Sequence, residues 1–221
     1  MLDLNRADLF ALRQRQLAAT LYDGAEGSVL WNDGALYSDI LDGNRLCAVL
    51  DTLHLQDLDV CEVKSRSAAD ALKAHFGFTG ENSCSQWVYP LPTPPEQRDA
   101  DIRILAREDV PLAAAHYHLT DDAVAYFHSC IDREQLWGLY ENGRLAGFIG
   151  LHTEGSMGML EILPEFRRRG YGCTLESYLI AEHLRRGWIP FCHVVDGNEA
   201  SLSLQRKLGL VKAELPAIWV F

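Results

Sequence analysis

Three consecutive arginines, Arg167 to Arg169, stand directly before a Gly-Tyr-Gly sequence in an otherwise acidic chain. An apolar run ends at Leu163 and a helical pattern begins near Gly172, so the residues between them form the entry to a helix. The free N–H groups and the dipole of a helix N-terminus favour an anion, and glycine lets an oxyanion approach the backbone. Arginine adds charge-assisted hydrogen bonds to phosphate. These residues therefore predict a phosphate or pyrophosphate site.

The same loop has a plainer interpretation, in which the arginines form a solvated face and Gly170 and Gly172 only permit a tight turn. The loop is not a P-loop, because no Lys-Ser or Lys-Thr follows the glycines, and it contains no G-x-G-x-x-G sequence. The order of the elements around the loop favours the phosphate site.

The strand end and the loop together resemble the coenzyme A pyrophosphate-binding loop of the GNAT superfamily of N-acetyltransferases. The matching residues are Ile162, Leu163, Pro164, Glu165, Phe166, Arg167, Gly170 and Gly172. Further along, the chain is similar to the second signature of that superfamily at Asn198, Ser201, Lys207 and Gly209. The two signatures stand in the superfamily's order, with a helix and a strand between them, and the match covers most of residues 101–221.

The resemblance implies an enzyme, an N-acyltransferase that moves an acetyl group from acetyl-CoA to the primary amine of a small molecule. Backbone groups near Ile162 and Leu163 are expected to bond the pantetheine arm and to polarise the thioester carbonyl, as an oxyanion hole does. The residues expected to contact the rest of the cofactor are Arg167, Arg168, Arg169, Gly170, Tyr171 and Gly172 at the pyrophosphate, with Asn198 and Ser201 at the start of the last helix. The amine attacks directly, without a covalent enzyme intermediate.

The general base is marked less clearly than the cofactor site. The superfamily often has a glutamate eleven residues before the first loop arginine, where this chain has Ser156. Glu154 lies on the same strand face if the strand extends that far, so it is the first candidate, ahead of Glu161 and His152. Each of the three is alternatively an exposed polar residue at a strand end. The superfamily usually has a tyrosine as the general acid where this chain has Gln205. No residue is therefore assigned to protonate the leaving thiolate.

These two departures favour a second hypothesis, a catalytically inert CoA-sensing or partner-binding module on the same fold. Ser156 stands in place of the usual glutamate and Gln205 in place of the usual tyrosine. The release of free thiol from acetyl-CoA in the presence of amines distinguishes the two hypotheses. The identity of the acceptor and the oligomeric state are not indicated by the sequence.

The composition narrows the classes of partner. The chain has 31 Asp and Glu against 20 Lys and Arg, a net charge of -11, and lacks the basic face that nucleic acid or an anionic membrane requires. No targeting segment or membrane-spanning stretch is expected. The six cysteines form no C-x-x-C pair and indicate reduced thiols, so we expect a cytoplasmic protein without a metal site.

Proline marks a division of the chain. Four prolines fall between Tyr89 and Ala100, a segment that reads as an extended linker. The predicted domains are therefore residues 1–97 and residues 98–221. In the second, the pattern predicts a strand, two helices over residues 111–118 and 121–132, a hairpin centred on Asn142, and alternating strands and helices to the end.

A weak internal repeat links the two parts. Residues 61–89 align with residues 193–221 at a constant offset of 132 and without gaps, so that Gly77, for example, meets Gly209. The identities are few, and chance similarity is the alternative. At this offset the counterpart of the arginine loop falls near Asp39–Asp42, whose acidity would repel pyrophosphate.

The predicted fold class is therefore α/β (α+β), a GNAT-like mixed and mostly antiparallel sheet flanked by helices, with a smaller related N-terminal α/β subdomain. Residues 1–97 are expected to be a degenerate GNAT-like unit that has lost the cofactor. We expect it to pack on the catalytic half and to form one wall of the acceptor site.

Overall fold

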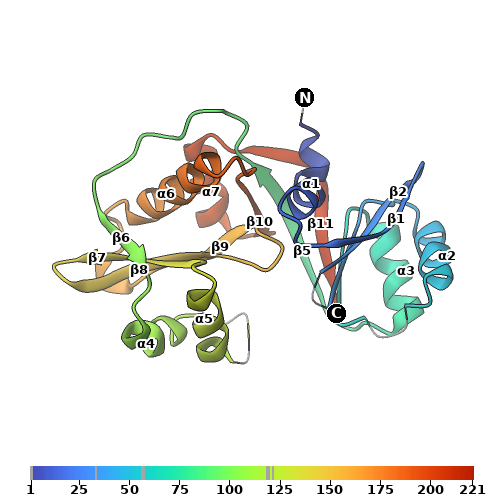
Figure 1. The fold of residues 1–221 in the computed structure, drawn as a ribbon, viewed down its shortest axis with the longest axis horizontal. Helices are drawn as coiled ribbons and strands as arrows, with labels where there is room; N and C mark the ends of the chain where they lie inside the picture. Colours follow the sequence, from blue (N-terminus) through green and yellow to red (C-terminus); the bar gives the residue numbers. More distant parts are fainter. Residues whose placement is uncertain (1, 33, 56–57, 118–119, 121) are drawn as a thin grey trace.

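The computed structural model describes residues 2–32, 34–55, 58–117, 120 and 122–221. Figure 1 shows two lobes, one built mainly from the N-terminal half of the chain and the other from the C-terminal half. In the described part of the chain, no helix is long and apolar enough to cross a membrane.

The N-terminal lobe begins with two short helices and ends with a long strand. Its elements are η1 (Leu4–Arg6), α1 (Ala7–Gln14), β1 (Ala19–Gly24), β2 (Gly27–Asn32), β3 (Ala35–Ser38), α2 (Gly43–Thr52), β4 (Val60–Val63), α3 (Arg66–Phe76) and β5 (Glu81–Val88).

The C-terminal lobe follows the proline-rich linker. Its elements are β6 (Asp101–Ile104), η2 (Arg107–Asp109), α4 (Val110–Ala114), α5 (Ala123–Asp132), β7 (Leu136–Glu141), β8 (Arg144–Leu151), β9 (Met157–Ile162), η3 (Pro164–Phe166), α6 (Tyr171–Arg185), β10 (Phe191–Val195), α7 (Glu199–Leu208) and β11 (Val211–Val220). Helices α6 and α7 lie on one side of its sheet and α4 and α5 on the other (Figure 1).

The two lobes exchange their closing strands. One sheet has the order β1-β2-β3-β4-β11-β5-β10, and the other has the order β6-β7-β8-β9. Strand β11 thus lies between β4 and β5 of the N-terminal lobe, and β5 pairs with β10 of the C-terminal lobe. The exchange makes one continuous sheet across the lobe junction.

The exchanged strands follow the internal repeat. The units β4-α3-β5 and β10-α7-β11 correspond at the offset of 132 residues. Cys84 pairs with Ala217 and Ser85 pairs with Pro216, and the same offset converts each pair into the other. Strands β5 and β11 therefore pair about a local twofold axis, which supports a structural repeat.

The two helices of the repeat end and begin in the same way. Gly77 ends α3 with φ +78° and Gly209 ends α7 with φ +84°, the left-handed conformation that glycine adopts without a steric penalty. Side-chain caps start both helices: Ser65 accepts from the Ala68 N–H, and Asn198 accepts from the Ser201 N–H.

The helices before the hairpin differ from the prediction. Helix α4 ends at Ala114, four residues before the predicted end at His118, which lies outside the described residues. Helix α5 starts at Ala123 because the Asp122 carboxylate accepts from the Ala125 N–H at 2.9 Å. The predicted first residue of this helix, Asp121, lies outside the described residues.

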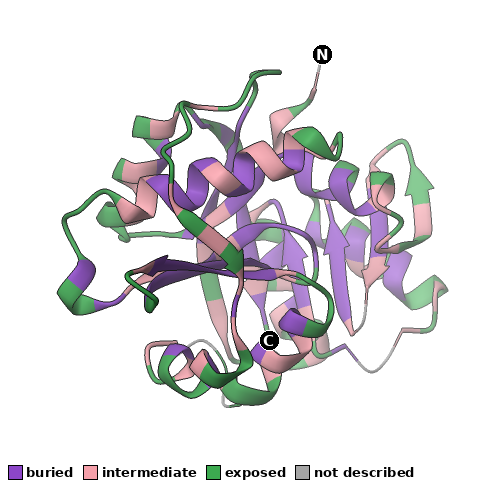
Figure 2. Ribbon diagram, turned by 60° about the vertical axis from the view of Figure 1, so that its left-hand side comes forward, coloured by how far each residue is buried: buried purple, intermediate pink, exposed green. Residues whose placement is uncertain are grey.

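The buried core follows the strands and the inward faces of the helices (Figure 2). In the C-terminal lobe, Phe127 of α5 meets Phe148 of β8 edge to face, with ring centroids 5.4 Å apart. From the other side, α6 buries Leu175, Leu179 and Ile180 completely. Packing on both faces fixes β8 and β9, the strands that carry the candidate site.

Candidate active site

The hydrogen-bonded sheets are interrupted between β9 and β10. Strand β9 ends one sheet and β10 ends the other, and the two strands contact one another without backbone pairing in the described part of the chain. Within β9, Met159 has φ +56° and the pairing with β8 shifts between Phe148 and Gly150. The outer edge of β9 pairs with no strand among the described residues, so its backbone groups are available to a ligand between β9 and β10.

The arginine loop runs from β9 to α6 beside this interruption. Gly170 is the N-cap of α6, with φ +85° and no side-chain cap, so the N–H groups of the first turn keep no side-chain acceptor. A Cβ added to Gly172 would meet only Leu204 Cδ2, at an ordinary 3.7 Å. Packing within the described chain does not require glycine at 172, and the residue keeps the helix N-terminus open to an anion.

The three arginines of the loop have different partners. Arg167 Nη2 donates to Glu161 Oε1 at 2.9 Å, and Arg169 Nη1 donates to Glu141 Oε2 at 2.7 Å. Both arginine side chains are about half exposed, and exposed ion pairs contribute little stability, so phosphate could displace these carboxylates. Arg168 is exposed and, among the described residues, forms no ion pair.

The predicted contacts that flank the loop are engaged within the protein. The Ile162 carbonyl accepts from Arg167 Nε at 2.9 Å, and the Leu163 N–H donates to the Ala146 carbonyl at 3.0 Å. The Tyr171 hydroxyl donates to Glu141, and this bond holds the pKa of the Glu141 carboxyl below its usual value. A cofactor at these residues therefore requires Arg167 to change its partner.

The second predicted set of cofactor contacts lies at the start of α7. Asn198 Oδ1 accepts from the Ser201 N–H at 3.1 Å, so Asn198 caps the helix. The Ser201 hydroxyl lies 3.5 Å from Gln205 Nε2. Both residues stand at the N-terminal turn of α7, and their contact with a cofactor stays a prediction.

Glu154 is buried, which contradicts the alternative interpretation that it is an exposed polar residue at a strand end. Only 5% of the residue is exposed, and the Ser156 hydroxyl donates to its carboxylate. Strand β9 begins at Met157, so Glu154 lies in a turn closed by the bond from the His152 N–H to the Ser156 carbonyl, 3.0 Å long. The turn, rather than strand alternation, brings Glu154 and Ser156 together.

The other two candidate bases have different surroundings. The Glu161 carboxylate is 29% exposed and forms an ion pair with Arg167, so it is tied to the arginine loop. His152 is half-buried, and its Nδ1 lies 3.4 Å from the Tyr126 hydroxyl. Its ring lies over Gly158, where an added Cβ would meet His152 Nε2 at 2.3 Å. The three candidates therefore do not form one cluster.

Tyrosines surround the Glu154 turn. Burial raises the pKa of Tyr117 to about 12, and burial likewise raises the pKa of Tyr37 and Tyr126; the nearby Glu154 charge adds to all three shifts. Tyr117 and Tyr126 stack with ring centroids 6.3 Å apart. The phenols stay neutral, so a carboxylate lies among aromatic rings, an environment suited to an amine.

The sequence did not indicate a buried carboxyl on α6. Glu176 is 3% exposed and faces Gln205 of α7, and burial raises its pKa to about 7. Glu176 Oε2 and Gln205 Oε1 have no hydrogen-bond partner among the described residues.

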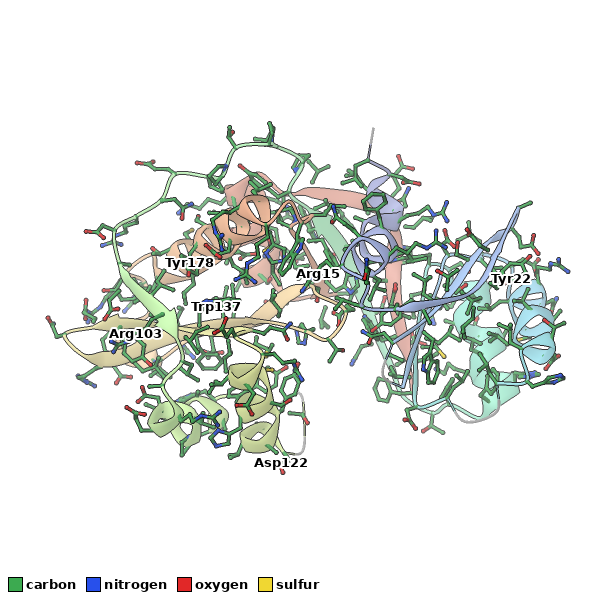
Figure 3. The ribbon with its side chains drawn as sticks, in the orientation of Figure 1. Arg15, Tyr22, Arg103, Asp122, Trp137 and Tyr178 are labelled. Atoms are coloured by element: carbon green, nitrogen blue, oxygen red, sulfur yellow. The ribbon has the colours of Figure 1, made fainter. Side chains whose placement is uncertain are left out.

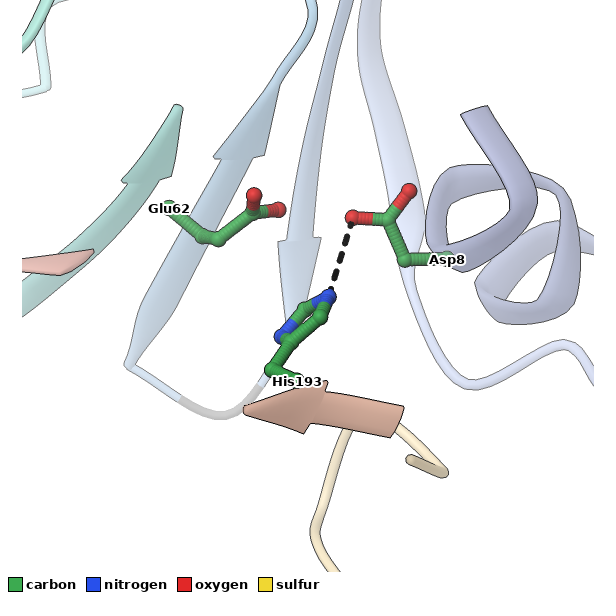
Figure 4. Close-up of side chains that lie close together, drawn as sticks. All are labelled: Asp8, Glu62 and His193. Carbon is green, nitrogen blue, oxygen red and sulfur yellow. Dashed lines mark ion pairs between the residues drawn. The ribbon is translucent and has the colours of Figure 1, made fainter. Parts of the chain in front are cut away.

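A second buried cluster, which joins the lobes, was also missed (Figure 4). Lys64 Nζ lies 2.5 Å from Asp8 Oδ2 and 2.8 Å from Glu62 Oε1, and it donates to Gln86 Oε1 at 3.1 Å. Burial, with the Lys64 charge, lowers the pKa of His193 to about 3. Asp8, Glu62 and His193 offer metal-ligand atoms within 4.8 Å of one another, but the Lys64 ammonium already forms ion pairs with both carboxylates.

The described residues of the N-terminal lobe contain no counterpart of the β9–β10 interruption. Strands β3 and β4 pair in parallel from Ala35 with Val60 to Ser38 with Val63. At the start of α2, the Asp42 carboxylate accepts from the Arg45 N–H at 2.8 Å and occupies the place where an anion would bind. These two features close the position that corresponds to the arginine loop.

Known proteins resemble both lobes. Residues 137–220 match the family model described as FR47-like protein. No curated protein sequence matches the chain. A Drosophila protein of known structure is 18% identical with a TM-score of 0.68, covering 98% of this chain and 86% of that chain.

Two further solved structures carry descriptions that bear on the fold. A protein from Novosphingobium aromaticivorans, described as an acetyltransferase from the GNAT family, is 20% identical with a TM-score of 0.60, covering 100% of this chain and 97% of its own. A tandem GNAT protein from the clavulanic acid biosynthesis pathway is 13% identical with a TM-score of 0.50, covering 97% and 87%. These likenesses extend over both lobes and show the fold.

Proposed function

Because the chain has the two-lobed fold of the GNAT acetyltransferases, we propose that its C-terminal lobe transfers an acetyl group from acetyl-CoA to the primary amine of a small molecule. The observation that carries the proposal is the interruption between β9 and β10, which ends at the open N-terminus of α6. An extended thioester cofactor needs an unpaired strand edge for its amides and an anion site for its pyrophosphate.

The residues present fit such a cofactor. Arg168 is exposed without an ion pair among the described residues, and Arg167 and Arg169 hold exposed pairs that phosphate can replace. Ile162 and Leu163, at the end of the β9 edge, stay the proposed neighbours of the pantetheine arm. Asn198 and Ser201 lie at the second helix N-terminus nearby, and we propose them as further cofactor contacts.

Glu154 is the proposed general base. An ammonium must lose a proton before its nitrogen can attack a thioester, and a buried carboxylate held by Ser156 can accept that proton directly or through a water. Glu161 and His152 stay alternative bases. Gln205 has no proton to donate as an acid, so the thiolate leaves unassisted or takes a proton from water.

The N-terminal lobe, residues 1–97, is proposed to bind no cofactor and to form a wall of the acceptor site. The paired strands β3 and β4 and the Asp42 cap support the first part, and Tyr37 beside Glu154 supports the second. We place the protein in the cytoplasm, which suits its six free thiols, and propose no metal and no nucleic-acid or membrane partner.

Calorimetry with CoA and acetyl-CoA tests the cofactor assignment, and thiol release with a panel of amines tests catalysis. We expect micromolar binding and amine-dependent thiol release. The absence of CoA binding to the intact protein would falsify the proposal. Binding without thiol release would favour the second candidate, an inert CoA-sensing module, which is suggested by Gln205 and Ser156 at the positions noted above.

A further inference from the structure

We propose that the N-terminal lobe positions the active-site turn, with Arg15 and Asn32 as positioning residues for Glu154. The inference rests on the proposed function and assigns to the first lobe a part in the reaction beyond that of a wall. The turn concerned is residues 152–156, between β8 and β9.

Both neighbours of Glu154 in the turn are held from the N-terminal lobe. Asn32 Nδ2, at the end of β2, donates to the Thr153 carbonyl at 3.1 Å. Arg15 Nη1, just after α1, donates to the Gly155 carbonyl at 3.2 Å. Figure 3 shows Arg15 between the two lobes. Because the two bonds fix the carbonyls on either side of Glu154, they orient the peptide that carries its side chain.

Gly155 is fitted to the guanidinium of Arg15. The glycine has φ +88°, and an added Cβ would lie 2.0 Å from Arg15 Nη1. On its other side, Arg15 lies over the Trp188 ring, with Cζ 3.9 Å from the centroid. A stacked and half-buried arginine loses few conformations when it binds the turn, so its position is well defined.

Arg15 also brings a positive charge to Glu154. Burial, assisted by the Arg186 charge and opposed by that of Glu154, lowers the pKa of Arg15 to about 10, so the guanidinium stays charged at neutral pH. A nearby cation favours the ionised form of a carboxyl, which is the form that a base needs.

Among the described residues, the thiol and the phenols whose pKa the Glu154 charge affects carry no charge near neutral pH. Burial raises the pKa of the thiol and the phenols that face it, which therefore stay neutral, and His152 adjoins the turn. These groups are Cys84 of β5, Tyr37 of β3, Tyr117 after α4 and Tyr126 of α5.

The test compares Arg15→Met, Arg15→Lys and Asn32→Leu with Arg13→Met, a matched control that lies two residues away in α1 and pairs with Asp23. CoA affinity is measured by calorimetry, and kcat and the amine KM by thiol release. Arg15→Met should lower kcat about tenfold or more, with CoA affinity within about twofold. Arg15→Lys keeps the charge but not the planar guanidinium, so it should restore only part of kcat.

Asn32→Leu separates geometry from charge, because it removes a hydrogen bond and no charge. We expect it to lower kcat while CoA affinity stays within about twofold. If Arg15→Met fails to fold by circular dichroism, Arg15→Lys and Asn32→Leu still decide the question. Normal kcat in these variants would overturn the inference while the proposed function stands. Absence of CoA binding or thiol release in the unmodified protein would overturn both.

Discussion

Lys64 Nζ lies 2.5 Å from Asp8 Oδ2, and neither side chain is exposed to solvent. The pair joins α1 to the end of β4, next to Glu62 and to Gln86 of β5. The charges neutralise one another in a region that water does not reach, so the pair can be tolerated only while both partners are present.

Removal of the Lys64 ammonium should destabilise the folded protein. We expect Lys64→Met to lower the free energy of unfolding by about 3–5 kcal/mol, because it leaves the Asp8 carboxylate buried without a counter-charge. Urea denaturation followed by circular dichroism measures the effect. Lys73→Met is the control, since the partly exposed Lys73–Glu81 pair should contribute at most about 1 kcal/mol. Equal losses in the two variants would show that burial of the Lys64 pair adds nothing.

Glu176 should make the protein less stable as the pH rises. Its pKa is about 7 in the folded protein against 4.5 for the unfolded reference, so the folded state binds the extra proton between these values. The contribution of Glu176 to the free energy of unfolding is largest below pH 4.5. It falls by about 3 kcal/mol as the pH rises through 7. Unfolding of Glu176→Gln at pH 5 and pH 8 should show a relative gain at pH 8 only.

Glu182 on the same helix is the control for the direction of the pH dependence. The bond from Arg185 holds the pKa of its carboxyl below the usual value, so Glu182→Gln should lose its effect as the pH falls, the reverse of Glu176→Gln. A Glu176→Gln variant with the same pH dependence as the unmodified protein would mean that this carboxyl is ionised at no cost.

The anion site can be tested with two glycines at opposite ends of α6. Gly170→Asp places a carboxylate at the helix N-terminus and should lower CoA affinity at least about tenfold through charge repulsion. Gly187→Asp imposes a comparable strain at the C-terminal end, where φ is +69° and an added Cβ would meet no atom within 4 Å. Calorimetry should show near-normal CoA binding for that variant. Equal losses would show that the effect is on folding rather than on the anion site.

Glu154 and Glu161 should differ in what they affect. We expect Glu154→Gln to lower kcat about a hundredfold with CoA affinity unchanged, since it removes a base without touching the arginine loop. Glu161→Gln frees Arg167 from its ion pair and should change CoA affinity more than kcat. Thiol-release kinetics and calorimetry on both variants check this. The reverse pattern would make Glu161 the base.

Contiguous features could be predicted from the sequence. The strand end, the arginine loop and the start of α6 adjoin along the chain, so hydrophobic pattern, glycine and charge were enough to place a helix N-terminus beside Gly170. The glycines that end α3 and α7 were also predictable, because a left-handed cap is a local requirement.

Contacts between distant residues could not be predicted in this way. The closing strands β5 and β11 have similar patterns, and nothing local says which lobe each will join, so their exchange was not foreseen. Glu154 was ranked first on an assumed strand alternation, whereas β9 begins only at Met157 and a turn buries the carboxylate.

The sequence by itself determined the GNAT-like architecture, the repeat and the place of the loop before α6. Each of these depends on residues that are adjacent in the chain or recur at a fixed spacing. The tertiary structure decided which groups surround Glu154. Arg15 and Asn32 reach its turn from more than a hundred residues away, and only the packing of one lobe against the other brings them there. Side chains meet across lobes through strand exchange and burial, which depend on the whole fold rather than on local pattern.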